Sequence, residues 1–140
     1  MSEQQNVALI QKLFEAFGRG DIQTILDNST DDSEFVSPGP SIIPYSGTKR
    51  GRAEIKSYFD ALIGTQSNMN LSIDQFVAQG DTVVAIGHYR ATVKATGKSI
   101  DSPVVLTFHI QNGKVRRHMV LGDTAALADS YTATAAAARS

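Results

Sequence analysis

The chain has 140 residues, the size of one ordinary domain. Its 13 basic and 14 acidic side chains give a net charge of -1, which offers no strong attraction for nucleic acid or an anionic membrane. It has no cysteine, so disulfides, thiol nucleophiles and thiolate metal sites are excluded. No apolar run approaches the roughly 20 residues of a membrane span, and the first residues lack a secretory pattern. We therefore expect a cytoplasmic protein, with one domain over residues 1–131 and a small-residue tail over 132–140.

The first half of the chain carries the hydrophobic period of α-helices. One apolar stripe, with spacings of three and four, consists of Val7, Ile10, Leu13, Phe14 and Phe17. Gly18-Arg19-Gly20 is expected to end this helix, and Asp21 is expected to cap a short second one. A third helix is predicted from Gly51 to Gly64. Its buried face would consist of Ile55, Tyr58, Phe59, Leu62 and Ile63.

A polar stretch and a proline-rich loop separate the second and third helices. Residues 27–34 are expected to form a turn, and residues 35–37 a short strand. The segment from Pro38 to Arg50 holds three of the four prolines, so it cannot be a regular interior strand. Because this loop also carries apolar side chains such as Ile43 and Tyr45, we expect it to act as a lid or a binding loop.

From Met69 onward the hydrophobic period changes to two, which predicts strands. In residues 82–94 the odd positions share one face, where Tyr89 stands among small residues, and the even positions share the other face. A hairpin signal at residues 95–98 leads to a further strand with the same alternation over residues 104–111. The second half of the chain is therefore predicted to be a sheet.

Asn-Gly at residues 112–113 predicts a tight hairpin turn before a last strand over residues 115–122. Asp123 is then expected to cap a short helix that reaches Ala128. Helices followed by a meander predict an α+β fold, with three helices packed inside a strongly curved antiparallel sheet of about five or six strands. Such a cone-shaped sheet leaves a conical hollow beside the third helix.

Several short motifs follow one another along the chain. They are Phe-Gly-Arg-Gly-Asp at 17–21, Ser-Gly-Thr-Lys-Arg-Gly-Arg-Ala-Glu-Ile at 46–55, Gln-Gly-Asp-Thr-Val-Val at 79–84, Lys-Ala-Thr-Gly-Lys at 94–98, Gly-Lys-Val-Arg-Arg-His at 113–118 and Asp-Thr-Ala-Ala-Leu at 123–127. In this order they resemble the SnoaL-like and ketosteroid-isomerase-like proteins of the nuclear transport factor 2-like superfamily. The resemblance implies a cone-shaped pocket and a homodimer that pairs sheet to sheet. It implies no single activity, since the fold hosts isomerases, cyclases, dehydratases, epoxide hydrolases and non-enzymatic binders.

The resemblance allows the chemistries of the fold to be compared with this chain. The tyrosine, the base and the acid of steroid isomerases correspond here to Leu13, Ser37 and Leu106, which disfavours proton shuttling of that type. The Arg-x-Asp pattern of the epoxide hydrolases is not found on a strand. Polyketide-cyclase-like members carry a His-Trp pair on the last strand, where this chain has His118-Met119. Half of the pair is present, which leaves a cyclase-like activity open.

His118 is the main catalytic candidate, because a histidine on the inner face can act as a general acid or base near neutral pH. Its alternative is a structural histidine paired with a backbone carbonyl or a carboxylate. Tyr89 is expected to donate to a developing oxyanion, or else to pack against a backbone group. Asp123 is expected to orient His118, or simply to cap the last helix. The strand register that the resemblance implies turns Arg116, His118, Val120 and Gly122 toward the hollow.

The remaining expected site residues are ligand-binding residues that line the hollow and its mouth. They are Ser37, Tyr45, Tyr58, Phe59, Leu106, Phe108 and Val120. No cofactor is expected. His88 and His109 fall on the outer sheet face, away from His118, so no metal site is expected. The half-apolar outer face instead predicts the contact of a homodimer.

Two functions are favoured from the sequence, and a third, a subunit in a larger assembly, would need a wide exposed apolar face. The first is the binding of a small hydrophobic molecule with cofactor-free acid–base chemistry, such as a cyclisation, an isomerisation or a dehydration. The second is a non-catalytic ligand-binding or dimeric interaction module. A convergent polar cluster in the hollow would favour the enzyme, and a dry aliphatic cone would favour the binder. Neither nucleic acid nor a membrane is expected as a partner.

Overall fold

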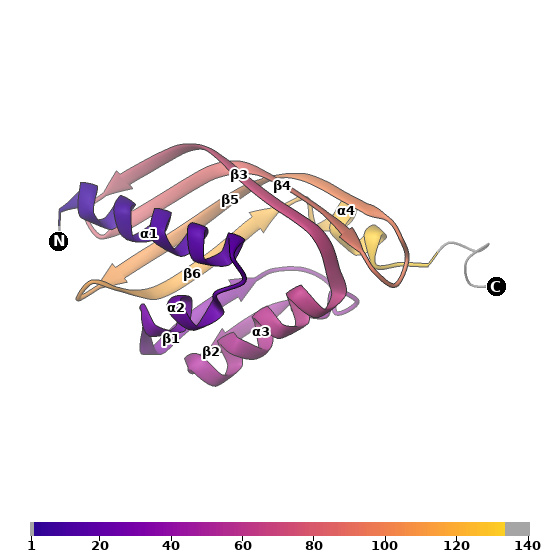
Figure 1. Cartoon of the computed structure of the whole chain (residues 1–140), viewed down its shortest axis with the longest axis horizontal. Coiled ribbons are helices and arrows are strands. Elements are labelled where there is room, and N and C mark those ends of the chain that lie inside the picture. The colour runs from indigo at the N-terminus through magenta and orange to yellow at the C-terminus, as the bar shows by residue number, and fades with distance from the viewer. Residues whose placement is uncertain (1, 134–140) are drawn as a thin grey trace.

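The computed structural model describes residues 2–133, which form helices and one large sheet (Figure 1). The helices are α1 (Glu3–Gly18), α2 (Ile22–Asp27), α3 (Gly51–Thr65) and α4 (Thr124–Ser130). The strands are β1 (Ser29–Ser37), β2 (Gly47–Arg50), β3 (Gln66–Gln79), β4 (Thr82–Val93), β5 (Ser99–Gln111) and β6 (Lys114–Gly122). The predicted α+β class is confirmed. Of the predicted tail, residues 134–140 lie outside the described residues.

The six strands form a single sheet in the order β2-β1-β6-β5-β4-β3. Neighbouring strands are antiparallel except β1 and β6, which run parallel. The long strands β3 to β6 arch over α1, and α3 packs against β1 at the other end of the sheet (Figure 1). The helices therefore fill part of the concave side, and the predicted curved sheet around N-terminal helices is confirmed.

Side-chain caps begin the first two helices where the sequence allows them. Ser2 Oγ accepts a hydrogen bond from the Gln5 backbone N–H, and the Gln5 side chain accepts one from the Ser2 N–H. Asp21 accepts hydrogen bonds from the backbone N–H and the hydroxyl of Thr24, and these bonds lower the pKa of the Asp21 carboxyl. The predicted cap at Asp21 is confirmed.

The turn expected over residues 27–34 is wrong, because most of this stretch belongs to β1. The inward positions Ser29 and Ser33 are fully buried but carry serine, so the segment lacks the apolar alternation that reveals a strand. Its outward carboxylates form ion pairs, such as Glu34 with Arg50. The end of the proline loop also forms the short strand β2, which lies at the edge of the sheet, where no second ladder is needed.

The alternation expected on β4 and β5 is confirmed. On β4, Val83, Ala85, Gly87, Ala91 and Val93 are buried, whereas their even-numbered neighbours are exposed or half-buried. On the convex face, Val77, Ile86 and Leu121 remain 44%, 38% and 43% exposed. The homodimer expected through this face stays a prediction.

The inward orientation expected for Arg116 is wrong. The pairing of β5 with β6 shifts between His109–Arg117 and Ile110–Val115, so Arg116 is the extra residue of a β-bulge. Val115 fills the buried position instead, and Arg116 forms an ion pair with Asp32 at 3.3 Å. Past the bulge, His118 keeps its predicted inward direction.

Candidate functional site

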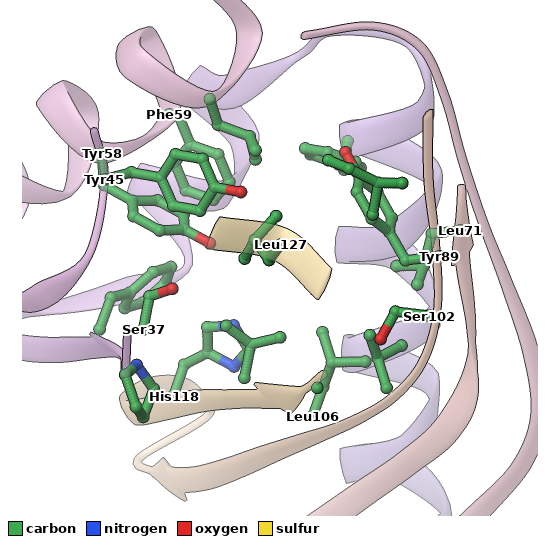
Figure 2. A pocket seen from close by; sticks show the side chains of 18 of the residues that line it. Ser37, Tyr45, Tyr58, Phe59, Leu71, Tyr89, Ser102, Leu106, His118 and Leu127 are labelled. Carbon is green, nitrogen blue, oxygen red and sulfur yellow. The ribbon is translucent and has the colours of Figure 1, made fainter. Parts of the chain in front are cut away.

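A cavity of about 140 Å³ lies between the concave face of the sheet and the helices (Figure 2). Most of the side chains that line it are aliphatic or aromatic. Its exposed lining residues, Pro38, Gly122 and Asp123, mark the mouth where β6 ends and α4 begins. In another protein, an engineered apolar cavity of about 150 Å³ binds benzene. This cavity therefore has room for a molecule of about one aromatic ring.

The structure brings all of the sequence-predicted site residues to this one cavity. They are His118, Asp123, Tyr89, Ser37, Tyr45, Tyr58, Phe59, Leu106, Phe108 and Val120. They come from four strands, two loops and α3, which explains why the curved sheet is needed to assemble them. The residues of β4 and β5 among them follow the predicted alternation, while the role of each residue depends on the contacts that it makes.

His118 projects from β6 into the cavity (Figure 2). Its ring is stacked on Phe108, with centroids 4.4 Å apart, and meets the ring of Phe35 edge-on at 4.9 Å. Nδ1 lies 3.1 Å from the carbonyl oxygen of Thr107. A carbonyl only accepts, so Nδ1 carries the proton and Nε2 has the free lone pair. Burial lowers the pKa of His118 to about 4, and the imidazole is therefore neutral at pH 7.

Asp123 does not orient His118, and that part of the prediction is wrong. Its carboxylate accepts a hydrogen bond from the Ala126 backbone N–H at 3.0 Å and so caps α4. The Thr107 carbonyl holds the imidazole instead. The backbone N–H of Asp123 donates to Ser102 Oγ at 3.0 Å, which ties the start of α4 to β5 beside the mouth of the cavity.

Substituting Asp123→Ala is therefore expected to lower the free energy of unfolding by about 1 kcal/mol, the usual cost of a lost N-cap. Asp123→Asn should recover most of this loss, because an asparagine side chain also accepts from the backbone. Urea unfolding of the three proteins measures the difference. A shift in the tautomer of His118, seen in ¹⁵N NMR of Asp123→Ala, would contradict the assignment of Asp123 as a helix cap alone.

A network of tyrosine hydroxyls surrounds the side chain of Gln66, which is 1% exposed. The amide nitrogen donates to Tyr45 Oη at 2.8 Å and to Tyr131 Oη at 2.9 Å. Tyr89 donates its hydroxyl proton to Gln66 Oε1 at 2.5 Å. Burial raises the pKa of Tyr45, Tyr58 and Tyr89, which are therefore neutral phenols. The Tyr89 proton is engaged by Gln66 in this structure, and the donation to a ligand expected of Tyr89 stays a prediction.

Gln66 was outside the predicted site because of a bulge in β3. Ser67 pairs with Thr92 and Asn70 with Arg90, so one extra residue stands between these pairs, where Asn68 has a φ of 53°. The bulge reverses the alternation, which would otherwise place Gln66 on the outer face. The alternation of residues 69–78 therefore holds no signal for the direction of Gln66.

Ser102 and Leu127 also line the cavity and were missed, for a simpler reason. The hydrophobic alternation predicts this strand from residue 104, whereas β5 starts at Ser99 and passes through Pro103. The proline fits because it lies one position beyond the last pair of β5 with β6, Val104–Gly122, where no ladder partner needs its N–H. Extending the alternation by two residues finds Ser102, but the packing of α4 over the cavity has no local signal.

The other two histidines lie on the outer face, as expected. His88 contacts Asp101, and His109 Nδ1 lies 3.1 Å from the Thr82 hydroxyl. Within residues 2–133, no three His, Asp or Glu side chains are grouped so that they could hold a metal ion. In the same part of the chain, no helix is long and apolar enough to cross a membrane. The cavity lining thus holds one imidazole, tyrosine and serine hydroxyls, and a carboxylate at the mouth.

Comparison with known proteins places the chain among relatives of similar size. The family model for the SnoaL-like domain matches residues 10–118. A nuclear transport factor 2-like protein from Burkholderia xenovorans LB400 is 31% identical, with 94% of this chain and 99% of that chain covered and a TM-score of 0.83. A second such protein, of unknown function, from Burkholderia pseudomallei is 28% identical, with coverages of 95% and 100% and a TM-score of 0.86. No curated protein matches the chain significantly.

A third solved structure is that of TerC co-crystallised with polyporic acid. It is 28% identical to this chain, with 91% of this chain and 98% of that chain covered and a TM-score of 0.82.

Proposed function

The chain belongs to the SnoaL-like domain family, and from this we propose that it binds a small, mostly apolar molecule in the cavity and catalyses a cofactor-free proton transfer on it. The observation that carries the proposal is the neutral imidazole of His118, whose Nε2 has no hydrogen-bond partner among residues 2–133 and lines an apolar cavity. A relative of the same fold was crystallised with polyporic acid, which supports a small organic ligand.

The size of the cavity limits the substrate. A volume of about 140 Å³ accepts about one ring with short substituents, whereas drug-sized ligands need pockets of about 300 Å³ or more. The apolar lining favours a ligand that is neutral over most of its surface. We therefore propose a one-ring carbonyl compound as the substrate class.

The proposed step is enolisation. His118 Nε2 takes a proton from the carbon next to a carbonyl, the C–H electron pair forms a C=C bond, and the carbonyl oxygen becomes an enolate. Neutral tyrosine hydroxyls in the cavity supply hydrogen bonds to that oxygen. The imidazolium then returns the proton to another carbon, which is an isomerisation, or to a departing hydroxyl, which leaves as water in a dehydration.

This step is tested without the natural substrate by the exchange of α-protons with D₂O, followed by ¹H NMR for acetophenone and cyclohexanone at pH 7. The wild-type protein should accelerate the exchange, and His118→Gln should lose at least about 100-fold of that acceleration. His109→Gln is the matched control, because His109 lies on the outer face, and it should exchange like the wild type. An equal rate in His118→Gln would remove this residue from the mechanism.

A second function, ligand binding without catalysis, is supported by one specific observation. Among residues 2–133, the only carboxylate in the cavity lining is Asp123, which is engaged as a helix cap, so His118 has no charged partner there for a proton relay. A wild-type protein that binds acetophenone in calorimetry but exchanges neither ketone would favour this second function.

A further inference from the structure

The hydroxyl group of Thr65 determines the direction of every hydrogen bond around Gln66. Thr65 Oγ1 lies 2.7 Å from the Ala61 carbonyl oxygen and 2.7 Å from Tyr131 Oη. A carbonyl only accepts, so the single proton of the Thr65 hydroxyl is spent on Ala61. Tyr131 must therefore donate its own proton to Thr65.

The orientation of the Gln66 amide follows from this. With its proton spent on Thr65, Tyr131 can only accept from Gln66, so the amide atom that faces it at 2.9 Å is the nitrogen. The reversed amide would require a second proton on the Tyr131 hydroxyl. The contact network thus assigns the amide orientation without reference to a ligand.

The amide in turn gives the cavity tyrosines opposite roles. Tyr45 accepts from Gln66, so its own proton is not used by the amide. The Tyr131 hydroxyl is the group of the described residues that faces this proton, and a ligand carbonyl competes with it. Tyr89 spends its proton on Gln66 Oε1 and keeps only lone pairs. Tyr58 lies edge-on to Tyr45, with ring centroids 5.6 Å apart, and both hydroxyl groups point into the cavity (Figure 2). One side of the network therefore donates to a ligand, and the other side accepts.

We infer that Gln66 is a positioning residue that makes the cavity selective for a one-ring molecule carrying both a carbonyl oxygen, bound by the Tyr45 hydroxyl, and a hydroxyl group, which donates to Tyr89. The inference rests on the proposed function, whose cavity it describes. It narrows the substrate class to hydroxylated one-ring ketones and aldehydes. In the proposed step, Tyr45 rather than Tyr89 then supplies the hydrogen bond to the enolate oxygen.

The inference is tested by calorimetric titration with three kinds of probe at pH 7: ethylbenzene, acetophenone, and the 2-, 3- and 4-hydroxyacetophenones. The wild-type protein should bind acetophenone about tenfold more tightly than its hydrocarbon analogue ethylbenzene, the value of roughly one hydrogen bond in an apolar site. The best of the hydroxyacetophenones should bind more tightly again, because it also donates to Tyr89.

Three variants separate the roles. Tyr45→Phe should lower the ratio of acetophenone to ethylbenzene affinity about tenfold, and Tyr89→Phe should remove the gain that the ring hydroxyl provides. Gln66→Glu replaces the amide by a carboxylate, which only accepts, so Tyr45 turns its proton toward the carboxylate and the ratio falls toward one. A purely structural role of Gln66 would weaken all probes alike and leave the ratio unchanged. If Gln66→Glu does not fold, the two tyrosine variants decide.

The outcomes separate this inference from the proposed function. If the wild-type protein binds none of the probes, the proposed function fails and the inference fails with it. If ethylbenzene and acetophenone bind equally well, or if Tyr45→Phe leaves their ratio unchanged, the inference alone is overturned. The inference is supported if Tyr45→Phe lowers the ratio of acetophenone to ethylbenzene affinity and if Tyr89→Phe removes the tighter binding of the hydroxyacetophenones.

Discussion

Substituting Gly87→Ala is expected to lower the free energy of unfolding by about 4 kcal/mol, a large part of the stability of an ordinary domain. A Cβ atom on Gly87 would lie 2.0 Å from the backbone oxygen of Ser72 and 2.9 Å from the Cα of Ile73. Both are backbone atoms of β3, so no side-chain rotation relieves the clash. Urea unfolding followed by circular dichroism measures the loss.

The reason for this close approach is the curvature of the sheet. The pairing of β3 with β4 shifts between Ile73–Gly87 and Gln75–Ile86, so β3 carries an extra residue there and bends sharply (Figure 1). Gly87 stands on the concave face at this bend and leaves space for the backbone of β3. Two residues before this bend, Leu71 lines the cavity.

A matched control for the same chemical change is Gly64→Ala in α3. Nothing lies within 4 Å of a Cβ at Gly64, and alanine is the better helix former, so this variant should gain about 0.5–1 kcal/mol. The two substitutions should thus change the stability in opposite directions. A Gly87→Ala protein within about 1 kcal/mol of the wild type would show that β3 can move away from β4 at little cost.

The sequence predicts those parts of the fold where one local pattern decides the structure. Strict alternation along β4 and β5 separates the buried from the exposed side chains, so it places Tyr89, Leu106 and Phe108 on the concave face before any contact is known. Asp21 and Asp123 begin their helices because a short acceptor precedes each apolar stretch. The same local reasoning places lining residues on the concave face where a strand is regular and its ends are predicted correctly, which was not the case for Ser102.

The parts that could not be predicted depend on an added residue or on distant partners. The bulge at Arg116 and the one before Asn70 each change which side chains face inward, and neither leaves a mark in the hydrophobic pattern. The inward serines of β1 hide that strand for a related reason. The role of Gln66 depends on Thr65 and on three tyrosines from other parts of the chain, so no local pattern contains it.

The second large effect is the dependence of stability on the protonation of His118. In the unfolded chain its pKa is the ordinary 6.5, whereas burial lowers it to about 4 in the folded state. Between these values the unfolded state binds a proton that the folded state does not. The neutral ring therefore makes its full contribution to the free energy of unfolding above about pH 6.5. As the pH falls toward 4, the free energy of unfolding decreases by about 3 kcal/mol.

The measurement compares urea unfolding of the wild type and of His118→Gln from pH 7.5 down to pH 4.5. Carboxylates such as Asp101, whose pKa is lowered mainly by the hydrogen bond with His88, affect both proteins alike and cancel in the difference. The stability advantage of the wild type should therefore shrink steadily below pH 6.5. If the free energies of unfolding of the two proteins changed in parallel with pH, the ring of His118 would be protonated as easily in the folded protein as in water.

The same low pKa predicts the pH profile of the proposed reaction. A base that is protonated only near pH 4 is available throughout the neutral range, so ketone exchange by the wild-type protein should be flat between pH 5.5 and 8. A rate that falls to half near pH 6.5 would indicate a solvated imidazole and would contradict the packing of His118 between Phe35 and Phe108. Burial thus makes His118 a weaker base than an imidazole in water. It also keeps Nε2 unprotonated and open to a ligand at neutral pH.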